Sequence, residues 1–216
     1  MLFGGCLVLM IKNIIFDIGN VLIKFDPLAY LTAECENFET VMTLYNEVFQ
    51  SKEWALLDEG VIEEDEAVRR VATRIPEYRD TVEKLIKTWE CFLIEDIRPS
   101  VYFLKRFKEM GYKLYALSNY PQRGFLYTEE KYEFFKLFDG KVISYEVKQL
   151  KPAPGIYHSL LSKYSLKPEE CIFIDDSLPN VETARALGMK AVHFRQTNQF
   201  LEVLVCLEPM RGINGK

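Results

Sequence analysis

The stretch that most constrains the fold covers residues 13–22, where an unbroken apolar segment runs into an acidic turn. Residues 14–16 are all apolar without alternation, which is typical of a strand covered on both faces in a parallel α/β sheet. Asp17 follows this strand, and Gly19-Asn20 turns the chain at once. Ligands bind at the carboxyl ends of strands in open α/β sheets, so Asp17 is placed where chemistry is expected. Taken alone, the stretch is equally compatible with an aspartate that only caps a turn or a helix.

The composition bounds the class of protein. The chain has 216 residues, of which 49% are apolar and 27% charged, as in a globular protein with one medium domain or one core with a smaller insert. The net charge is -5 and no run of five basic residues occurs, which argues against nucleic-acid binding. No apolar stretch is long enough to cross a bilayer, so no membrane contact is predicted.

The cysteines and the first residues bear on location. Five cysteines are scattered without a CxxC pair, which favours reduced thiols in a cytoplasmic protein over disulfides or a zinc site. Residues 1–10 are apolar but lack the basic start of a signal peptide. Met10 lies three residues before the predicted strand and is a candidate initiator, so whether residues 1–10 belong to the mature protein stays open.

Residues 27–96 read as helices with short breaks. Apolar side chains recur at helical spacing from Phe38 to Phe49 and again from Glu63 to Ile75, and Pro76 ends the second pattern. No strand-like alternation appears in this segment. We therefore predict a helical cap domain at 27–96, inserted into a core domain made of 11–26 and 97–216.

The rest of the chain alternates strands with helices. After a helix that Pro99 starts and Gly111 stops, further strands are predicted at 113–117, 142–145, 171–174 and 191–194. After a loop that begins at Tyr120-Pro121, a helix rich in Phe and Tyr is expected to run to about Phe138. Such alternation indicates βαβ units. The predicted fold class is therefore α/β, a three-layer Rossmann-like parallel sheet with an inserted helical cap.

Three of these strands end in a polar residue followed by a turn, at Asp17, Ser118 and Asp175. If the first strand is central, with the second and fourth beside it, the three groups converge on one point. Carboxylates without a neighbouring histidine or cysteine form an oxygen-ligand site that suits Mg²⁺, and a cation would relieve their repulsion. Ser118 can donate a hydrogen bond to a phosphate oxygen, and Lys151 can supply a compact positive charge. An aspartate in line with such a phosphate can act as nucleophile.

Four segments in order resemble the motifs of the haloacid dehalogenase superfamily. They are residues 17–22 (DIGNVL), Ser118-Asn119, Lys151-Pro152, and residues 173–176 (FIDD) with Asn180. The likeness continues to residue 189, and the helical insert lies where that superfamily carries a cap. The forms of the first and last motifs are most similar to bacterial sugar-phosphate phosphatases of the α-D-glucose-1-phosphate phosphatase type, and the phosphatase domain of soluble epoxide hydrolases is also similar.

The resemblance implies a role for each matching position. Asp17 would be the nucleophile and a metal ligand, and Asp176 the direct ligand of the last motif. Ser118, Asn119 and Lys151 would bind the substrate phosphate. The carbonyl of Gly19 would complete the Mg²⁺ site, and Asp175 and Asn180 would orient the ligands from outside.

One position departs from the superfamily pattern. A second aspartate, which serves as general acid and base, usually stands two residues after the nucleophile, where this chain has Gly19. The Gly19 carbonyl can still coordinate a metal but cannot move a proton. The leaving oxygen must then take its proton from water or from a cap residue, and general acid–base catalysis is typically worth about 10²–10⁴-fold.

Structural interpretations compete with these roles. The pair Asp175-Asp176 can cap the following helix, and the only two histidines, His158 and His193, are expected to be structural. Trp54 and Trp89 are expected to be mostly core, with one or two cap aromatics facing the substrate.

The leading functional hypothesis is a magnesium-dependent phosphomonoesterase that acts on a small phosphorylated metabolite, a sugar phosphate above all, through an aspartyl-phosphate. A dehalogenase would use the same nucleophile without metal, and Gly19 is compatible with it, but Asp175-Asp176 would then have no use. The third hypothesis is a protein that is not an enzyme, either a receiver-like protein or a phosphate-binding protein that has lost its catalytic activity. The expected assembly is a monomer or weak homodimer.

Overall fold

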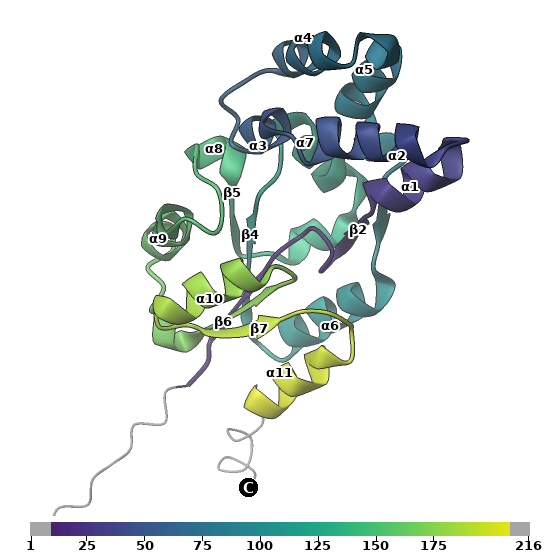
Figure 1. Ribbon diagram of the computed structural model, residues 1–216. Coiled ribbons are helices and arrows are strands. Elements are labelled where there is room, and N and C mark those ends of the chain that lie inside the picture. Colours follow the sequence, from purple (N-terminus) through teal and green to yellow (C-terminus); the bar gives the residue numbers. More distant parts are fainter. Residues whose placement is uncertain (1–9, 208–216) are drawn as a thin grey trace, which may run out of the picture.

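The computed structural model describes residues 10–207, and the open question about residues 1–10 therefore falls almost entirely outside it. Its centre is a five-stranded sheet in the order β5-β4-β1-β6-β7, in which all neighbouring strands are parallel (Figure 1). The strands are β1 (Asn13–Phe16), β4 (Lys113–Ser118), β5 (Gly140–Ile143), β6 (Cys171–Asp175) and β7 (Lys190–His193). This order confirms that the first strand is central, flanked by the strands that end in Ser118 and Asp175.

Helices cover both faces of the sheet and give it three layers. On one face, Phe16 of β1 lies 6.3 Å from Phe107 of α6 (Arg98–Glu109) and 6.2 Å from Phe200 of α11 (Gln199–Leu207), measured between ring centres. On the other face, Phe173 of β6 packs edge-on against Tyr157 of α9 (Pro154–Lys163), next to α10 (Leu178–Ala186). Every residue of β1 is buried, which explains why residues 14–16 are all apolar.

A short two-stranded antiparallel sheet marks where the chain leaves and re-enters the core. It pairs β2 (Ile23–Phe25) with β3 (Ile94–Asp96). The prediction that residues 27–96 contain no strand is wrong for β3, because three residues are too few to show an alternation. Between the two strands lie the helices α1 (Pro27–Glu34), α2 (Phe38–Leu44), η1 (Tyr45–Phe49), α3 (Lys52–Asp58), α4 (Glu64–Arg74), η2 (Pro76–Tyr78), α5 (Arg79–Lys87) and η3 (Trp89–Cys91).

These helices, α1 to α5, gather on one side of the molecule next to α7 (Gln122–Lys131) and α8 (Ser144–Val147) (Figure 1). Both α7 and α8 follow the carboxyl ends of core strands, and α3 packs on α8. The helical segment therefore lies over the edge of the sheet where Asp17 is placed. Its buried side chains form one continuous apolar cluster with those of β1 and α6.

Two element boundaries differ from the sequence prediction. The strand expected at 142–145 ends at Ile143, and Ser144 begins α8; the buried hydroxyl of Ser144 hydrogen-bonds the backbone of Tyr120 and of Asp58. The single helix expected up to about Phe138 is divided into α7 and the 3₁₀ segment η4 (Glu133–Leu137). Among the described residues, no helix has the length and apolar character needed to span a membrane.

Candidate active site

Asp17 lies at the carboxyl end of the central strand and is almost fully buried. Its backbone N–H donates to the carbonyl of Ile174 at 2.8 Å, which continues the β1–β6 pairing by one residue. Its Oδ1 accepts hydrogen bonds from the backbone N–H of Ile18 and the hydroxyl of Ser118, both at 2.7 Å. The neighbouring strands β4 and β1 thus place Ser118 directly beside Asp17, as predicted from the strand ends.

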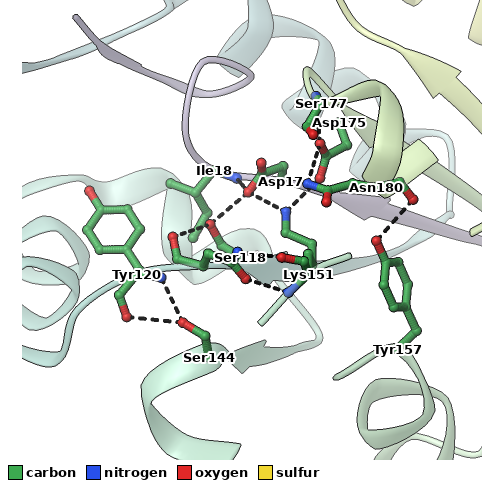
Figure 2. A network of polar contacts seen from close by, with 11 residues as sticks. Asp17, Ile18, Ser118, Tyr120, Ser144, Lys151, Tyr157, Asp175, Ser177 and Asn180 are labelled. Atoms are coloured by element: carbon green, nitrogen blue, oxygen red, sulfur yellow. Dashed lines mark hydrogen bonds and ion pairs between the residues drawn. The ribbon is translucent and has the colours of Figure 1, made fainter. Parts of the chain in front are cut away.

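Lys151 supplies the positive charge of the site. Its Nζ lies 2.9 Å from Oδ1 of Asp17 and 2.6 Å from Oδ2 of Asp175, and Figure 2 shows the ammonium group between the two carboxylates. Burial alone would lower the pKa of Lys151, but the charges of Asp17 and Asp175 outweigh it and raise the pKa. Lys151 therefore stays protonated and holds the two acids together.

Asp175 is completely buried and fully bonded. Its Oδ1 accepts from the backbone N–H of Ser177 at 2.8 Å and from Nδ2 of Asn180 at 2.9 Å, while Oδ2 faces Lys151. The hydroxyl of Tyr157 in turn donates to the Asn180 carbonyl at 3.0 Å (Figure 2). With both oxygens engaged, Asp175 is a fixed support for Lys151 and for the start of α10.

Asn119 binds the backbone of Lys151 through both ends of its amide. Its Nδ2 donates to the Lys151 carbonyl at 3.0 Å, and its Oδ1 accepts from the Lys151 N–H at 2.8 Å. This reciprocal pair fixes the loop that carries the lysine. Because these two hydrogen bonds occupy the side chain of Asn119, this residue can contact a phosphate only through its backbone.

Three carboxylates come together at this edge of the sheet. One oxygen each of Asp17, Asp175 and Asp176 lies within 4.8 Å of the others. Burial raises the pKa of Asp17 to about 7; Lys151 opposes this effect, and the charges of Asp175 and Asp176 add to it. Burial and the charge of Asp175 likewise raise the pKa of Asp176. The single positive charge of Lys151 does not balance the repulsion among the three carboxylates. Because the cluster also offers only oxygen donors, it fits a hard divalent cation.

The turn after Asp17 is held by Asn20, the second residue of the Gly19-Asn20 turn expected from the sequence. Asn20 adopts a left-handed conformation at φ 52°, which asparagine tolerates better than most residues. Its Oδ1 accepts from the N–H of Phe25 at 3.0 Å, and its side chain also hydrogen-bonds Asp176. Asparagine tolerates the left-handed conformation and carries a side-chain acceptor, so it is the residue in the sequence that indicates such a turn.

Gly19 sits on this turn and lines a cavity beside the nucleophile. The cavity has a volume of about 130 Å³ and is walled by Gly19, Ile23, Phe25, Trp54, Asp58, Trp89, Asn119, Tyr120 and Pro121. Trp54 and Trp89 of the cap line this cavity, and that such aromatics face the substrate stays a prediction. A Cβ added to Gly19 would meet no atom within 4 Å, and the residue does not have positive φ.

Asp58 is the cavity residue that the sequence did not reveal. It is the last residue of α3 and comes from the cap, far from Asp17 along the chain. Burial, and then the negative charge of Asp17, raise the pKa of Asp58 to about 8. In the sequence Asp58-Glu59-Gly60 reads only as a turn, and nothing local distinguishes it from other acidic turns.

Neither histidine belongs to the cluster of carboxylates. His158 is exposed on α9. Nε2 of His193 lies 2.9 Å from the carbonyl oxygen of Asp176 and so fixes the backbone beside the carboxylates.

The cap is fastened to the core beside the cavity. Arg123 of α7 forms ion pairs of 2.7 Å with Glu64 of α4 and with the buried Glu90 of η3. The ring of Trp89 rests against Gly124, where an added Cβ would lie 2.3 Å from the ring. The cavity wall contributed by Trp89 is therefore set by a core helix.

A family model described as haloacid dehalogenase-like hydrolase matches residues 11–188. Among curated proteins, the sesquiterpene phosphatase astK of Aspergillus oryzae is 27% identical over 182 residues, which cover 84% of this chain and 89% of that protein. The D-ribitol-5-phosphate phosphatase of Bacteroides thetaiotaomicron is 28% identical over 198 residues, covering 84% and 90%.

Solved structures share the fold. A HAD family enzyme of Bacteroides thetaiotaomicron superposes with a TM-score of 0.70 at 22% identity, covering 89% of this chain and 98% of that one. The wild-type form of that enzyme in complex with magnesium and inorganic phosphate gives a TM-score of 0.66 at 23% identity, covering 86% and 94%.

Proposed function

The chain belongs to the haloacid dehalogenase-like hydrolases and is a phosphatase of that family, and from the geometry of its site we propose that it is a magnesium-dependent phosphomonoesterase with Asp17 as nucleophile. The observation that carries this proposal is the end of β1, where Asp17 contacts Ser118 and Lys151 and is one of three clustered carboxylates.

Each group has a role in this proposal. Asp17 attacks phosphorus and forms an aspartyl-phosphate, which water then hydrolyses. Ser118 and the Lys151 ammonium bind the phosphoryl oxygens and stabilise the charge that develops on them. Asn119 positions Lys151, and Asp175 with Asn180 supports it from the other side.

The residues present fit Mg²⁺. Asp17, the Gly19 carbonyl and Asp176 would hold it, because Asp175 already uses both oxygens within the protein. When bound, the cation neutralises the phosphate and orients it toward Asp17.

The cavity supports a small leaving group. Its volume of about 130 Å³ is below the roughly 300–1,000 Å³ of pockets for drug-sized ligands. We therefore keep a small phosphorylated metabolite as substrate and a sugar phosphate as the first candidate, in line with the polyol phosphate named for the Bacteroides relative.

A second candidate is a phosphate ester with an apolar or aromatic leaving group. The cavity walls favour it, since Phe25, Trp54 and Trp89 come from the cap and Tyr120 from the core. A relative that is named a sesquiterpene phosphatase agrees with this chemistry, although the small cavity argues for a shorter group.

The test is release of inorganic phosphate from a panel of sugar, polyol, isoprenyl and aryl phosphates, with magnesium and with excess chelator. We expect release with magnesium only, and full activity in chelator would contradict the proposal.

Melting curves add a readout besides activity: Mg²⁺ should raise the Tm of the wild type through binding to the folded state and should do so much less in Asp176→Ala. Glu182→Gln, an exposed acidic position on α10, is the control and should keep the full shift.

We also propose that the protein works in the cytoplasm as a monomer or weak homodimer. The described cysteines Cys35, Cys91 and Cys171 are all free thiols, which supports a reducing compartment, whereas Cys206 and Cys6 lie outside the side chains that the structure describes.

A further inference from the structure

Apart from Asp58, no side chain of the site described above is free to give a proton to the leaving oxygen. Asp17 is the nucleophile, Asp175 and Asp176 are engaged with Lys151 or the metal site, and Gly19 has no side chain. Breaking the P–O bond of an ordinary ester without such a proton leaves an alkoxide, which is a poor leaving group.

Asp58, an acidic residue of the cap, lines the cavity beside Gly19, where the chain has no acidic side chain. It lines the same cavity as Gly19 and Asn119, on the side contributed by the cap. Its carboxyl group is close enough to Asp17 for the charge of Asp17 to act on it, and it has no hydrogen-bond or ion-pair partner among the described residues.

The position of Asp58 is fixed by contacts that leave its carboxyl group free. Its backbone carbonyl accepts a hydrogen bond from the hydroxyl of Ser144, at the start of α8 in the core. Two residues later the carbonyl of Gly60 accepts from Nζ of Lys148. Gly60 has φ +69°, and an added Cβ would meet the backbone of Tyr145 at 2.9 Å, so the turn after Asp58 sits directly on the core.

We propose that Asp58 is the general acid and base of this enzyme, supplied from the cap in place of a side chain at residue 19. This inference rests on the proposed phosphatase function and identifies one more residue in its reaction.

The proton balance is complete with this residue. In the first step a bond forms between Asp17 Oδ and phosphorus, the bond from phosphorus to the leaving oxygen breaks, and the Asp58 carboxyl gives its proton to that oxygen. In the second step water attacks phosphorus, the bond from phosphorus to Asp17 breaks, and the Asp58 carboxylate takes a proton from the water. The products are an alcohol and inorganic phosphate, and both carboxyl groups return to their starting states.

The protonated form is available near neutral pH. Burial and the charge of Asp17 hold the pKa of Asp58 at about 8. A raised pKa keeps a carboxyl group protonated to higher pH than in an ordinary aspartate, which favours the form that a general acid needs.

The test uses aryl phosphates of similar shape whose leaving groups differ in acidity, from p-nitrophenyl to phenyl to p-methoxyphenyl phosphate. In Asp58→Asn we expect kcat/KM for p-nitrophenyl phosphate to change by less than about threefold, because nitrophenolate leaves without a proton. For phenyl and p-methoxyphenyl phosphate we expect a loss of about 10²-fold, the low end of acid–base contributions. The neighbouring Glu59→Gln does not alter the cavity wall and should leave all three values unchanged.

Either of two outcomes overturns the inference: an equal loss on all three substrates, which would indicate a positioning role, or no loss on any. Asn has the shape of Asp, and Asp58 is anchored through its backbone, so the variant should fold; a melting curve checks this. Failure of the phosphatase proposal is separate, because it would appear as absent magnesium-dependent hydrolysis of p-nitrophenyl phosphate by the wild type itself.

Discussion

The ammonium group of Lys151 lies 2.9 Å from Oδ1 of Asp17, and both side chains are almost fully buried. Two segments far apart in the sequence thus meet as a charged pair under the cap. Because Lys151 also contacts Asp175 at 2.6 Å, it is the only described lysine or arginine that forms a salt bridge with a carboxylate of this cluster.

Removing this lysine should affect both activity and stability. Lys151→Met leaves Asp17 and Asp175 as unpaired buried acids, and breaking a buried pair in this way typically costs about 3–5 kcal/mol. We expect hydrolysis to fall below detection and the free energy of unfolding, from urea titration at pH 7, to fall by an amount of this order.

A double variant separates charge from packing. If repulsion between the acids causes the loss, Asp17→Asn in the Lys151→Met background should recover part of the stability. Lys163→Met, at an exposed lysine on α9, serves as the control. No recovery in the double variant would mean that Lys151 matters for its packing rather than for its charge.

Much of this site was predictable from the sequence because it is built from strand ends. Asp17, Ser118 and Asp175 each follow a buried strand, and parallel pairing brings such ends to one edge whatever the rest of the chain does. The order of the sheet and the convergence of these residues followed from that rule.

What the sequence could not reveal depends on how the cap packs on the core. Asp58 and Trp89 reach the cavity only because α3 sits on α8 and Trp89 sits on Gly124. Such contacts join segments with no periodic relation to each other. The strand β3 was missed for another reason, since three residues give too short a pattern.

The contact between Trp89 and Gly124 leads to a second prediction. An alanine Cβ at residue 124 would lie 2.3 Å from the buried ring, which must then move and carry the cavity wall with it. Gly124→Ala should lower Tm and raise KM for the preferred substrate. In Gly155→Ala the Cβ meets only the Gln149 side chain, so this variant should behave like the wild type. An unchanged KM in Gly124→Ala would show that Trp89 does not shape the substrate site.

The pH dependence of stability offers a third prediction, about Asp58. Its pKa of about 8 lies above the value of about 3.9 in unfolded chains, so the fold favours the neutral acid. The stability gained from this preference is fully present below about pH 4 and is lost as pH rises through about 8. Besides burial, the charged group that raises the pKa of Asp58 is Asp17, and Asp58 in turn raises the pKa of Tyr120.

Asn cannot ionise, so Asp58→Asn should be more stable than the wild type at alkaline pH. We expect the difference in Tm to grow between pH 5 and pH 8.5 and to reach at least about 2–4 °C, the shift that 1 kcal/mol gives in a chain of this size. Melting curves of both proteins across this range, in chelator, are the measurement. A constant difference would indicate that Asp58 ionises as an ordinary surface acid.

A fourth prediction concerns Gly19. A side chain there would enter open space beside the nucleophile at a residue without positive φ, so Gly19→Asp should fold. It should restore hydrolysis of phenyl phosphate in the Asp58→Asn background by about tenfold or more, since a carboxyl group again reaches the leaving oxygen. In the otherwise wild-type protein the gain should be smaller. Gly19→Asn, of similar shape but without a proton to give, is the matched control, and equal rescue by both variants would argue against proton transfer.

A chemical trap tests directly whether Asp17 carries the phosphoryl group during turnover. Borohydride reduces an acyl phosphate to an alcohol, so an aspartyl-phosphate trapped during turnover becomes homoserine, which peptide mass spectrometry can locate. We expect homoserine at position 17 when the enzyme is quenched with phosphate ester and magnesium present, and none in excess chelator or in Asp17→Asn. Homoserine at another aspartate, or its absence from an enzyme that is turning over, would show that Asp17 is not the nucleophile.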